Sequence, residues 1–234
     1  MREQDQPVGP IRWTIVPDRR ADPVTNPGIL PDTEVVDVSP RSVRAADADV
    51  KVDRQARILE AVLRLLSVQG ISGVSMRAVA REAGVSLGLV NYYYEDKTSL
   101  IRAALHRIEE QDIAIVEPDL TLEPEERLRA ALKRVADPEF LTTEYLSLRL
   151  QLWALARVHE DFERINTVAQ KRYRAGLAAL IRAARPGLSR GECGKRAADI
   201  DVLQNGLWLT ALLGLDRASI RRSVTRCEEI ALAD

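Results

Sequence analysis

The stretch Ser75-Met-Arg-Ala-Val-Ala-Arg-Glu-Ala-Gly84-Val85-Ser86-Leu-Gly-Leu-Val-Asn-Tyr-Tyr-Tyr94-Glu-Asp-Lys97 predicts two short helices joined by a tight turn. Ser75 and Ser86 are of a type preferred at helix N-caps, and each precedes a short helical pattern, at Met76–Ala83 and Leu87–Tyr93. Gly84 can adopt the positive φ that the turn needs. A small core shared by the two helices would consist of Val79, Ala83, Val85 and Val90. This spacing is typical of a helix-turn-helix, whose second helix can lie in the major groove of DNA.

The second of these helices would carry the side chains that read a DNA sequence. Its outward face presents Leu87, Gly88, Leu89, Asn91 and Tyr92. An asparagine can make a bidentate contact to adenine, and an apolar side chain can touch a thymine methyl group. Tyr93 and Lys97 flank this face, where a hydroxyl and an ammonium group would contact phosphates. Residues 51–100 carry seven basic and five acidic side chains, a local balance of +2 that mildly supports contact with DNA.

Helical periodicity continues almost without interruption from Asp53 to the end of the chain of 234 residues. Asp53 is the expected N-cap of a first helix that ends at Gly70 with a positive φ, and Asp96 is the expected N-cap of a helix from Lys97 to about Val116. No strand alternation and no internal repeat is visible. Further amphipathic segments follow at about 125–136, 142–158, 161–185, 192–214 and 217–232. We therefore expect an all-α protein of about nine helices.

The first fifty residues differ in composition from the rest of the chain. They hold seven of the eleven prolines, show no helical period and carry six arginines against nine acids, a balance of −3. Such a segment buries too little apolar surface to offset its ordering entropy, so residues 1–52 are expected to form a disordered extension. The segment Ile11–Val16 allows a short strand or docking peptide, but a passive tail is the favoured interpretation.

Composition excludes several classes of protein. The net charge is −1, so any contact with DNA must come from a local patch. The two cysteines, Cys193 and Cys227, are isolated, which favours reduced thiols and no metal site; no cofactor is expected. With no apolar run of about 18 residues and no secretion signal, we expect a cytoplasmic protein without a membrane span. The acid pairs Glu109-Glu110 and Glu125-Glu126 are interpreted as solvated helix ends, so an enzyme is not expected.

The pattern Gly84-Val85-Ser86-x-Gly88-x-Val90-x-x-Tyr93-Tyr94-x-x-Lys97-x-x-Leu100, which follows a helix ending in Gly70, resembles the DNA-binding domain of the TetR family over about residues 53–110. The resemblance implies a homodimer that binds double-stranded operator DNA, usually represses, and releases DNA when a small molecule fills a pocket in the C-terminal helices. Asn91 and Tyr92 depart from the family's more usual Tyr and His, so no operator sequence can be carried over. Positions that match the family's DNA contacts are Arg77, Ser86, Leu87, Leu89, Asn91, Tyr92, Tyr93 and Lys97.

The C-terminal part is similar to the BetI-like subgroup of this family. The matching residues are Leu152–Ala156, His159–Asp161, Lys171–Arg174 and Asp201–Leu209. Members that control the choline pathway bind a cationic choline-type effector, whereas many relatives respond to other molecules. The aromatic residues Trp153, Tyr173 and Trp208 are candidates for an effector site, because an aromatic face can stack on a cation. They are equally explained as large core side chains, which is the favoured interpretation for the two tryptophans.

The resemblance and the helical pattern together predict the organisation of the chain. Residues 53–112 would form the helix-turn-helix domain of three helices, and residues 118–234 the effector-binding and dimerisation domain. Helices 192–214 and 217–232 would build a four-helix dimer interface or, alternatively, an interior pair. The expected function is a repressor that leaves its operator when a small molecule binds. The alternatives are a DNA-binding module without small-molecule control and, much less favoured, a helical enzyme.

Overall fold

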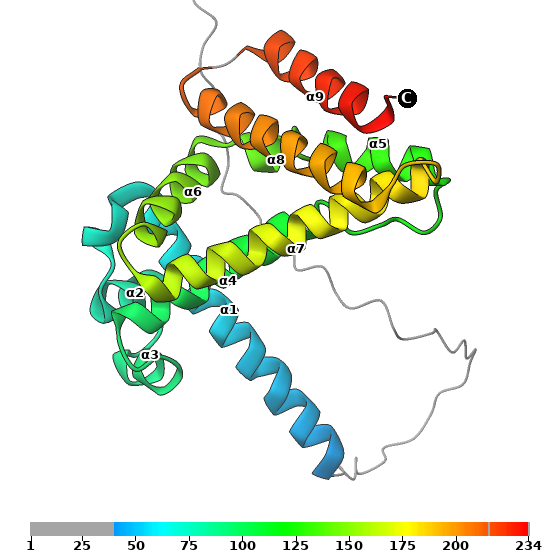
Figure 1. Ribbon diagram of the computed structural model, residues 1–234. Helices are drawn as coiled ribbons and strands as arrows, with labels where there is room; N and C mark the ends of the chain where they lie inside the picture. The colour runs from blue at the N-terminus through cyan, green and yellow to red at the C-terminus, as the bar shows by residue number, and fades with distance from the viewer. Residues whose placement is uncertain (1–39, 215, 234) are drawn as a thin grey trace, which may run out of the picture.

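The structure, a computed structural model, describes residues 40–214 and 216–233, and side chains from residue 53 onward. This part of the chain contains nine α-helices, one short 3₁₀ helix and no strand (Figure 1), which confirms the all-α prediction. The helices are α1 (Pro40–Gly73), α2 (Met76–Ala83), α3 (Leu87–Tyr93), α4 (Lys97–Ala114), α5 (Pro124–Arg134), η1 (Pro138–Leu141), α6 (Thr143–Ala156), α7 (Glu160–Ala184), α8 (Arg190–Leu212) and α9 (Arg217–Leu232).

Helix α1 differs from its prediction at the N-terminal end. It begins at Pro40 and not at Asp53, so the expectation that residues 1–52 lack structure is wrong for residues 40–52. Proline fits the first turn of a helix because its missing N–H would have no partner there. The residues after it hold no further proline and no glycine before Gly70, and alanine and arginine favour helix. Residues 1–39, including Ile11–Val16, lie outside the described residues.

A glycine interrupts α1 near its end, as the sequence indicated. Gly70 has φ 67° and ψ −169°, a non-helical conformation with the positive φ that only glycine adopts readily. One further turn, Ile71 to Gly73, follows this interruption. The amide of Val74 closes the turn by donating to the carbonyl of Ile71 at 3.2 Å. The interruption thereby directs the chain into α2.

Two groups of helices occupy opposite ends of the molecule (Figure 1). Helices α2 and α3 lie at one end, and α8 and α9 lie at the other. The long helices α4 and α7 pack side by side between them, and α7 also contacts α5, α6 and α8. Helix α6 packs on both α1 and α8. Through α4, α6 and α7, the two ends are therefore joined by direct helix packing.

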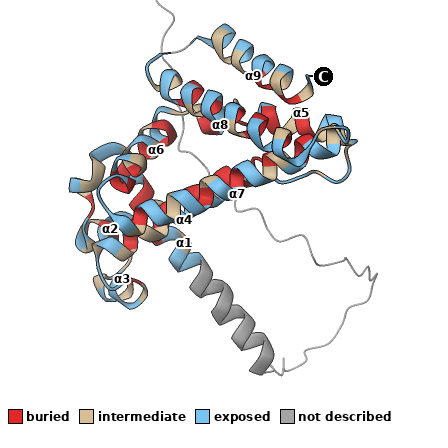
Figure 2. Cartoon of the chain, in the orientation of Figure 1, coloured by how far each residue is buried: buried red, intermediate tan, exposed pale blue. Residues whose placement is uncertain are grey.

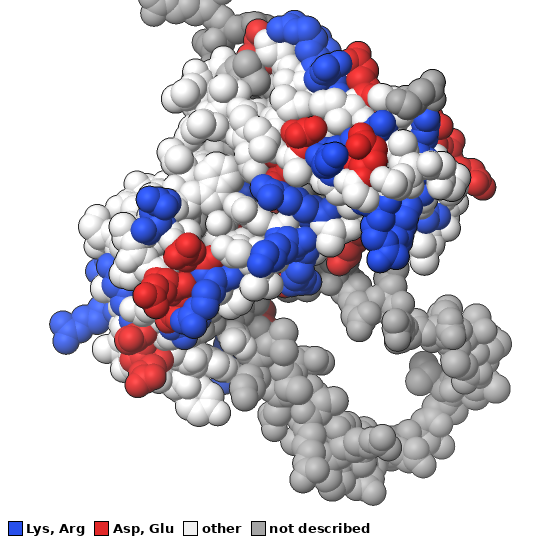
Figure 3. All heavy atoms as spheres, in the orientation of Figure 1, with Lys and Arg blue, Asp and Glu red and all other residues white. Residues whose placement is uncertain are grey.

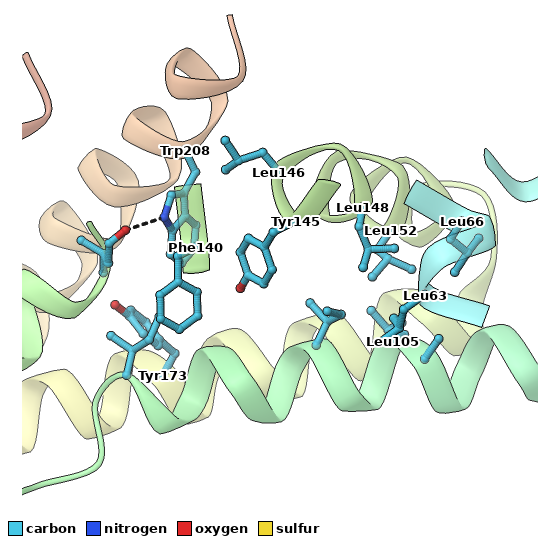
Figure 4. Packing of buried hydrophobic residues seen from close by; sticks show 14 of the residues in the cluster. Leu63, Leu66, Leu105, Phe140, Tyr145, Leu146, Leu148, Leu152, Tyr173 and Trp208 are labelled. Atoms are coloured by element: carbon cyan, nitrogen blue, oxygen red, sulfur yellow. Dashed lines mark hydrogen bonds between the residues drawn. The ribbon is translucent and has the colours of Figure 1, made fainter. Parts of the chain in front are cut away.

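One continuous apolar core runs through both ends, with the buried residues on the inner faces of the helices (Figure 2). An aromatic cluster marks its centre near α8. The ring of Phe140 lies 5.3 Å from that of Tyr145 and 6.3 Å from that of Trp208 (Figure 4). The indole N–H of Trp208 donates to the carbonyl of Val135 at 2.9 Å, which satisfies the one polar atom of this side chain. Among the described helices, none is long and apolar enough to cross a membrane.

Candidate DNA-reading surface and acidic cavity

Serine caps and one glycine build the α2–turn–α3 unit. The Ser75 hydroxyl accepts from the amide of Ala78 at 3.1 Å, and the Ser86 hydroxyl accepts from the amide of Leu89 at 3.2 Å. Gly84 ends α2 in the left-handed conformation, with φ 65° and ψ 36°. Both helices have the bounds that the sequence predicted. The local sequence alone therefore determines where this unit turns.

The inner face of the unit is packed against α1. Val79, Ala83 and Val90 are buried, and Val85 is half-buried against the same core. Two contacts were not foreseen from the sequence. The Arg57 guanidinium donates to the carbonyl of Ala83 at 3.2 Å, and the amide of Gln55 donates to the hydroxyl of the buried Tyr94 at 3.4 Å, so α1 holds both ends of the unit. The sequence carried only a weak signal for these contacts, because the polar side chains of Gln55 and Arg57 are expected to face solvent when α1 is considered alone.

The outer face of α2 and α3 remains accessible, and we call it the α3 surface: Arg77, Ser86, Leu87, Leu89, Asn91, Tyr92 and Tyr93. Asn91 and Arg77 are exposed, and Tyr92 has 71% of its surface exposed. Leu87 and Tyr93 are half-buried because each also packs on the core. The rings of Tyr92 and Tyr93 meet edge to face at 5.2 Å. In Figure 3, acidic and basic side chains are interspersed over this end of the molecule.

Lys97, the eighth predicted contact residue, has a structural partner. Its ammonium donates to the carbonyl of Ile71 at 2.6 Å and thereby links the first turn of α4 to the last turn of α1. An ammonium has three donors, so the remaining hydrogens can still meet a phosphate. Asp96 caps α4 by accepting from the amide of Ser99 at 2.7 Å. These contacts fix the first turn of α4 to α1, and only residues 94–96 separate that turn from the end of α3.

A second candidate site lies between α4, α6, α7 and α8, and we call it the acidic cavity. Its free volume is about 20 Å³, enough for about one water molecule. Three carboxylates and one guanidinium lie in its wall, so the lining carries more negative than positive groups. The lining residues are Glu109, Asp112, Ile113, Arg149, Asn166, Ala169, Gln170, Tyr173, Asp201, Gln204, Asn205 and Trp208.

Arg149 of α6 is the cation of this cavity. Its guanidinium carbon lies 4.3 Å from the ring centre of Trp208 and 4.9 Å from that of Trp153, within the range of cation–π attraction. It also forms an ion pair with Asp112 of α4, which accepts a hydrogen bond from the hydroxyl of Tyr145. Burial lowers the pKa of Arg149 to about 10, which leaves the group protonated at neutral pH.

The other polar groups of the cavity are unequally satisfied. Asp201 accepts from Arg174 at 2.6 Å and from Asn205 at 3.1 Å. The Tyr173 hydroxyl donates to the side-chain oxygen of Gln204 at 2.6 Å, and burial raises the pKa of Tyr173, so it stays neutral. Among the residues that the structure describes, none is a hydrogen-bond partner for the Nε2 of Gln204, although this side chain is only 2% exposed. An unsatisfied buried donor costs free energy unless a ligand or a water supplies an acceptor.

Glu109 corrects the sequence analysis, which interpreted it as part of a solvated helix end. The residue is buried, and burial raises the pKa of its carboxyl to about 7. Only its neighbour Glu110 is exposed, where it forms an ion pair with Arg172. The signal was present in the sequence: Leu105, Glu109 and Asp112 are spaced i, i+4 and i+7 and share one face of α4.

The three candidate effector residues lie close to one guanidinium but not in one cavity. Tyr173 and Trp208 line the acidic cavity, and both also belong to the buried core. Trp153 is half-buried and contacts Arg149 from the side of a neighbouring groove. Arg149 and Trp208 are shared by the cavity and this groove, whose other lining residues are Leu146, Leu150, Trp153, Leu209 and Leu212.

Two family models match separate parts of this chain. The family model described as "Bacterial regulatory proteins, tetR family" matches residues 58–104, and the model described as "BetI-type transcriptional repressor, C-terminal" matches residues 124–232. The chain belongs to the TetR family. It is a DNA-binding transcriptional regulator, as the sequence analysis predicted, and the matched segments contain the α3 surface and most of the acidic cavity.

Individual relatives of this TetR-family protein are regulators too. The HTH-type transcriptional regulator BetI of Cronobacter sakazakii is 28% identical over 164 residues, which cover 68% of this chain and 80% of the relative. A putative transcriptional regulator from Pseudomonas aeruginosa PAO1 superposes with a TM-score of 0.66 at 26% identity, over 76% of this chain and 88% of that chain. A putative transcriptional regulator from Saccharomonospora viridis, solved in complex with choline, has the same fold, with a TM-score of 0.60 at 21% identity, over 78% and 96% of the two chains.

Helix α8 of this TetR-family protein presents an apolar stripe to the outside. Val202 is 64% exposed and Leu209 is 43% exposed, and Leu213 beyond the helix end is 80% exposed. The opposite face of α8, with Ala197, Ile200 and Leu207, is buried. The sequence analysis expected this helix to take part in a dimer interface or an interior pair, and within the described part of one chain this stripe is not covered.

Proposed function

We propose that this protein is a repressor that binds operator DNA as a homodimer in the cytoplasm and leaves the DNA when a small organic cation enters the acidic cavity. The observation that carries this proposal is the place of the cavity. Asp112 and Glu109 in its wall belong to α4, and only residues 94–96 separate the first turn of the same helix from the end of α3. A ligand that moves α4 would thus change the orientation of α3.

The α3 surface supports the DNA-binding half of the proposal. Its exposed residues lie on a short capped helix that can enter the major groove. We propose that Asn91 and Tyr92 contact base edges, while Arg77, Tyr93 and Lys97 contact phosphates. The proposed DNA contacts are Arg77, Ser86, Leu87, Leu89, Asn91, Tyr92, Tyr93 and Lys97, within a DNA-binding domain of residues 53–112.

The apolar stripe of α8 supports the homodimer, within an effector-binding and dimerisation domain of residues 118–234. Val202, Leu209 and Leu213 would lose contact with water when two α8–α9 pairs meet in a four-helix interface. A symmetric pair of α3 helices is also what a palindromic operator requires, because its half-sites repeat about every 34–36 Å. A second copy of this chain is therefore the proposed partner for the stripe.

The charge of the acidic cavity supports a cationic effector. Asp112 is paired with Arg149 and Asp201 with Arg174, whereas Glu109 has no ion pair within the described part of the chain. A ligand cation would compensate the charge of this carboxylate. The choline complex of the regulator from Saccharomonospora viridis indicates that this fold can hold a small organic cation. Trp153, Tyr173 and Trp208 would supply the aromatic surface around it.

Selection of binding sites from random duplex DNA, followed by an affinity series, tests this function. We expect the wild type to select a palindromic sequence, and Asn91→Ala to change the preferred base at one position of each half-site by about 1–3 kcal/mol of discrimination. Glu126→Ala, an exposed change on α5, serves as the control and should keep the wild-type preference. Absence of any affinity for duplex DNA in dilute buffer would reject the proposal.

The small free volume of the cavity favours one alternative, a DNA-binding regulator without small-molecule control. A thermal-shift screen of organic cations separates the two. An effector that binds the folded state raises the melting temperature with its concentration. If no cation shifts the melting temperature while operator binding is normal, the alternative holds.

A further inference from the structure

We infer that Arg149 is a built-in competitor of the effector: it occupies the cation position of the acidic cavity, and a ligand acts by displacing it. The inference rests on the proposed function, because it assumes a cationic effector of this cavity. It adds how the ligand would act and assigns Asp112, Trp153 and Trp208 as the groups for which the ligand and Arg149 compete.

Arg149 already has the surroundings that a bound organic cation requires. Two indole rings lie within 4.9 Å of its guanidinium carbon, and Asp112 supplies the counter-charge. Aromatic faces and one carboxylate, shielded from water, are the environment that weakly hydrated cations prefer. A ligand cation that seeks these groups therefore meets an occupied position.

The dimensions of the cavity lead to the same conclusion. With Arg149 in place, the free volume of about 20 Å³ accommodates no more than about one water molecule. Even tetramethylammonium is several times larger than a water molecule, so a side chain must move before it can enter. Arg149 is long and flexible, and it lies in the wall shared with the groove between α6 and α8. The half-buried Trp153 and the 43% exposed Leu150 border this groove, so the guanidinium has a path to solvent.

Displacement of Arg149 would break a specific link between helices. The ion pair of Arg149 with Asp112 ties α6 to α4, and α6 also packs on α1. Helix α1 holds the α2–α3 unit through Arg57 and Gln55, and Lys97 joins the first turn of α4 to the last turn of α1. A ligand cation that takes Asp112 keeps its charge compensated but releases α6. The equilibrium can then shift toward an arrangement with poor operator affinity.

The test uses the full chain, tetramethylammonium chloride as the probe, and sodium chloride to hold the ionic strength constant. Binding is followed through tryptophan fluorescence and calorimetry without DNA, and operator affinity is measured separately. We expect Arg149→Met to bind tetramethylammonium at least about tenfold more tightly than the wild type, because the competing state is removed. We also expect its operator affinity to be lower and no longer sensitive to the cation.

Two further variants keep the test decisive. Arg149→Lys retains the charge, so it should fold like the wild type, but its ammonium lacks the planar surface that stacks on both indoles. Its affinity for the cation should lie between those of the wild type and Arg149→Met. Arg157→Met, an exposed change at the end of the same helix, should match the wild type in both measurements.

Three outcomes would overturn the inference. If tetramethylammonium releases DNA from the wild type and from both Arg149 variants equally, the inference fails while the proposed function stands. If Arg149→Met and Arg149→Lys lose cation binding, Arg149 assists the ligand instead of competing with it. If no variant binds the cation although all bind the operator, the cationic effector and the inference fail together.

Discussion

The α3 surface and the acidic cavity are built in opposite ways. The caps that set the bounds of α2 and α3 come from within a few residues, through the hydroxyls of Ser75 and Ser86 and the backbone of Gly84. The cavity instead combines side chains from four helices, and its central ion pair joins Asp112 to Arg149. Substitutions on the exposed α3 surface should therefore cost little stability. Substitutions in the acidic cavity should change both ligand binding and the stability of the fold.

The largest expected change in stability that tests this contrast comes from removing the indole of Trp208. Trp208→Ala should lower the free energy of unfolding by about 3–5 kcal/mol, since it opens a cavity and leaves the carbonyl of Val135 without its donor. Tyr92→Ala on the α3 surface, where the side chain is 71% exposed, should change it by no more than about 0.5 kcal/mol. Urea unfolding measures both, and similar values for the two variants would contradict the contrast.

The next effect concerns Glu109 and depends on pH. Because the pKa of Glu109 is raised in the folded protein, from 4.5 to about 7, its ionisation destabilises the fold. The penalty is absent below about pH 4.5, grows as the pH rises to 7, and is complete above that. We expect Glu109→Gln to raise the free energy of unfolding by about 2–3 kcal/mol at pH 8 and by almost nothing near pH 4.5.

The control for this prediction is its exposed neighbour. Glu110→Gln removes an exposed ion pair with Arg172 and should change the stability by less than about 1 kcal/mol at either pH. If Glu109→Gln has the same small effect at pH 8, the carboxyl of Glu109 is solvated in solution, and the charge of the cavity has to be revised.

A smaller effect is expected at Lys97, which belongs to both the fold and the α3 surface. Lys97→Ala should weaken binding to all DNA sequences alike and reduce the slope of log affinity against log salt by about 1. It should also cost about 1 kcal/mol of stability, because the carbonyl of Ile71 loses its donor. Lys97→Arg retains the charge and should restore most of the salt slope. An unchanged slope in Lys97→Ala would show that this ammonium serves only the fold.

The smallest effect distinguishes the capping role of Ser86 from its proposed contact with DNA. Ser86→Ala should lower the free energy of unfolding by about 1 kcal/mol, since the amide of Leu89 loses its acceptor. Ser86→Asp keeps a good N-cap and so keeps the stability, but it places a negative charge beside the phosphates. Operator affinity should therefore fall further in the aspartate variant than in the alanine variant. Equal affinities would move Ser86 away from the DNA.

The α3 surface could be predicted from the sequence more fully than the acidic cavity. The bounds of α2 and α3 were predicted to the residue, because serine caps and a left-handed glycine act locally. The start of α1 was wrong, because residues 40–52 were judged together with the proline-rich segment before them. The 3₁₀ helix η1 was not predicted, since four residues are too few for a periodic signal.

The acidic cavity was only partly predictable. Trp208 and Tyr173 were named for their ring chemistry, whereas Arg149 was missed, although Trp153 follows it by one helical turn. The sequence pattern of α6 does not indicate that Arg149 contacts Trp208 of α8, nor that Asp112 of α4 is the counter-ion of Arg149. Such pairings depend on how distant helices cross, and a single sequence does not encode that in a local pattern.

The packing of α7 has a consequence for how the molecule melts. This helix packs on α4, which belongs to the DNA-reading end, and also on α5, α6 and α8, and α6 packs on α1. Cutting the chain between α4 and α5 would leave the apolar sides of α1 and α4 facing water. Heating should therefore produce a single cooperative transition, and a fragment ending at residue 112 should be unstable by itself.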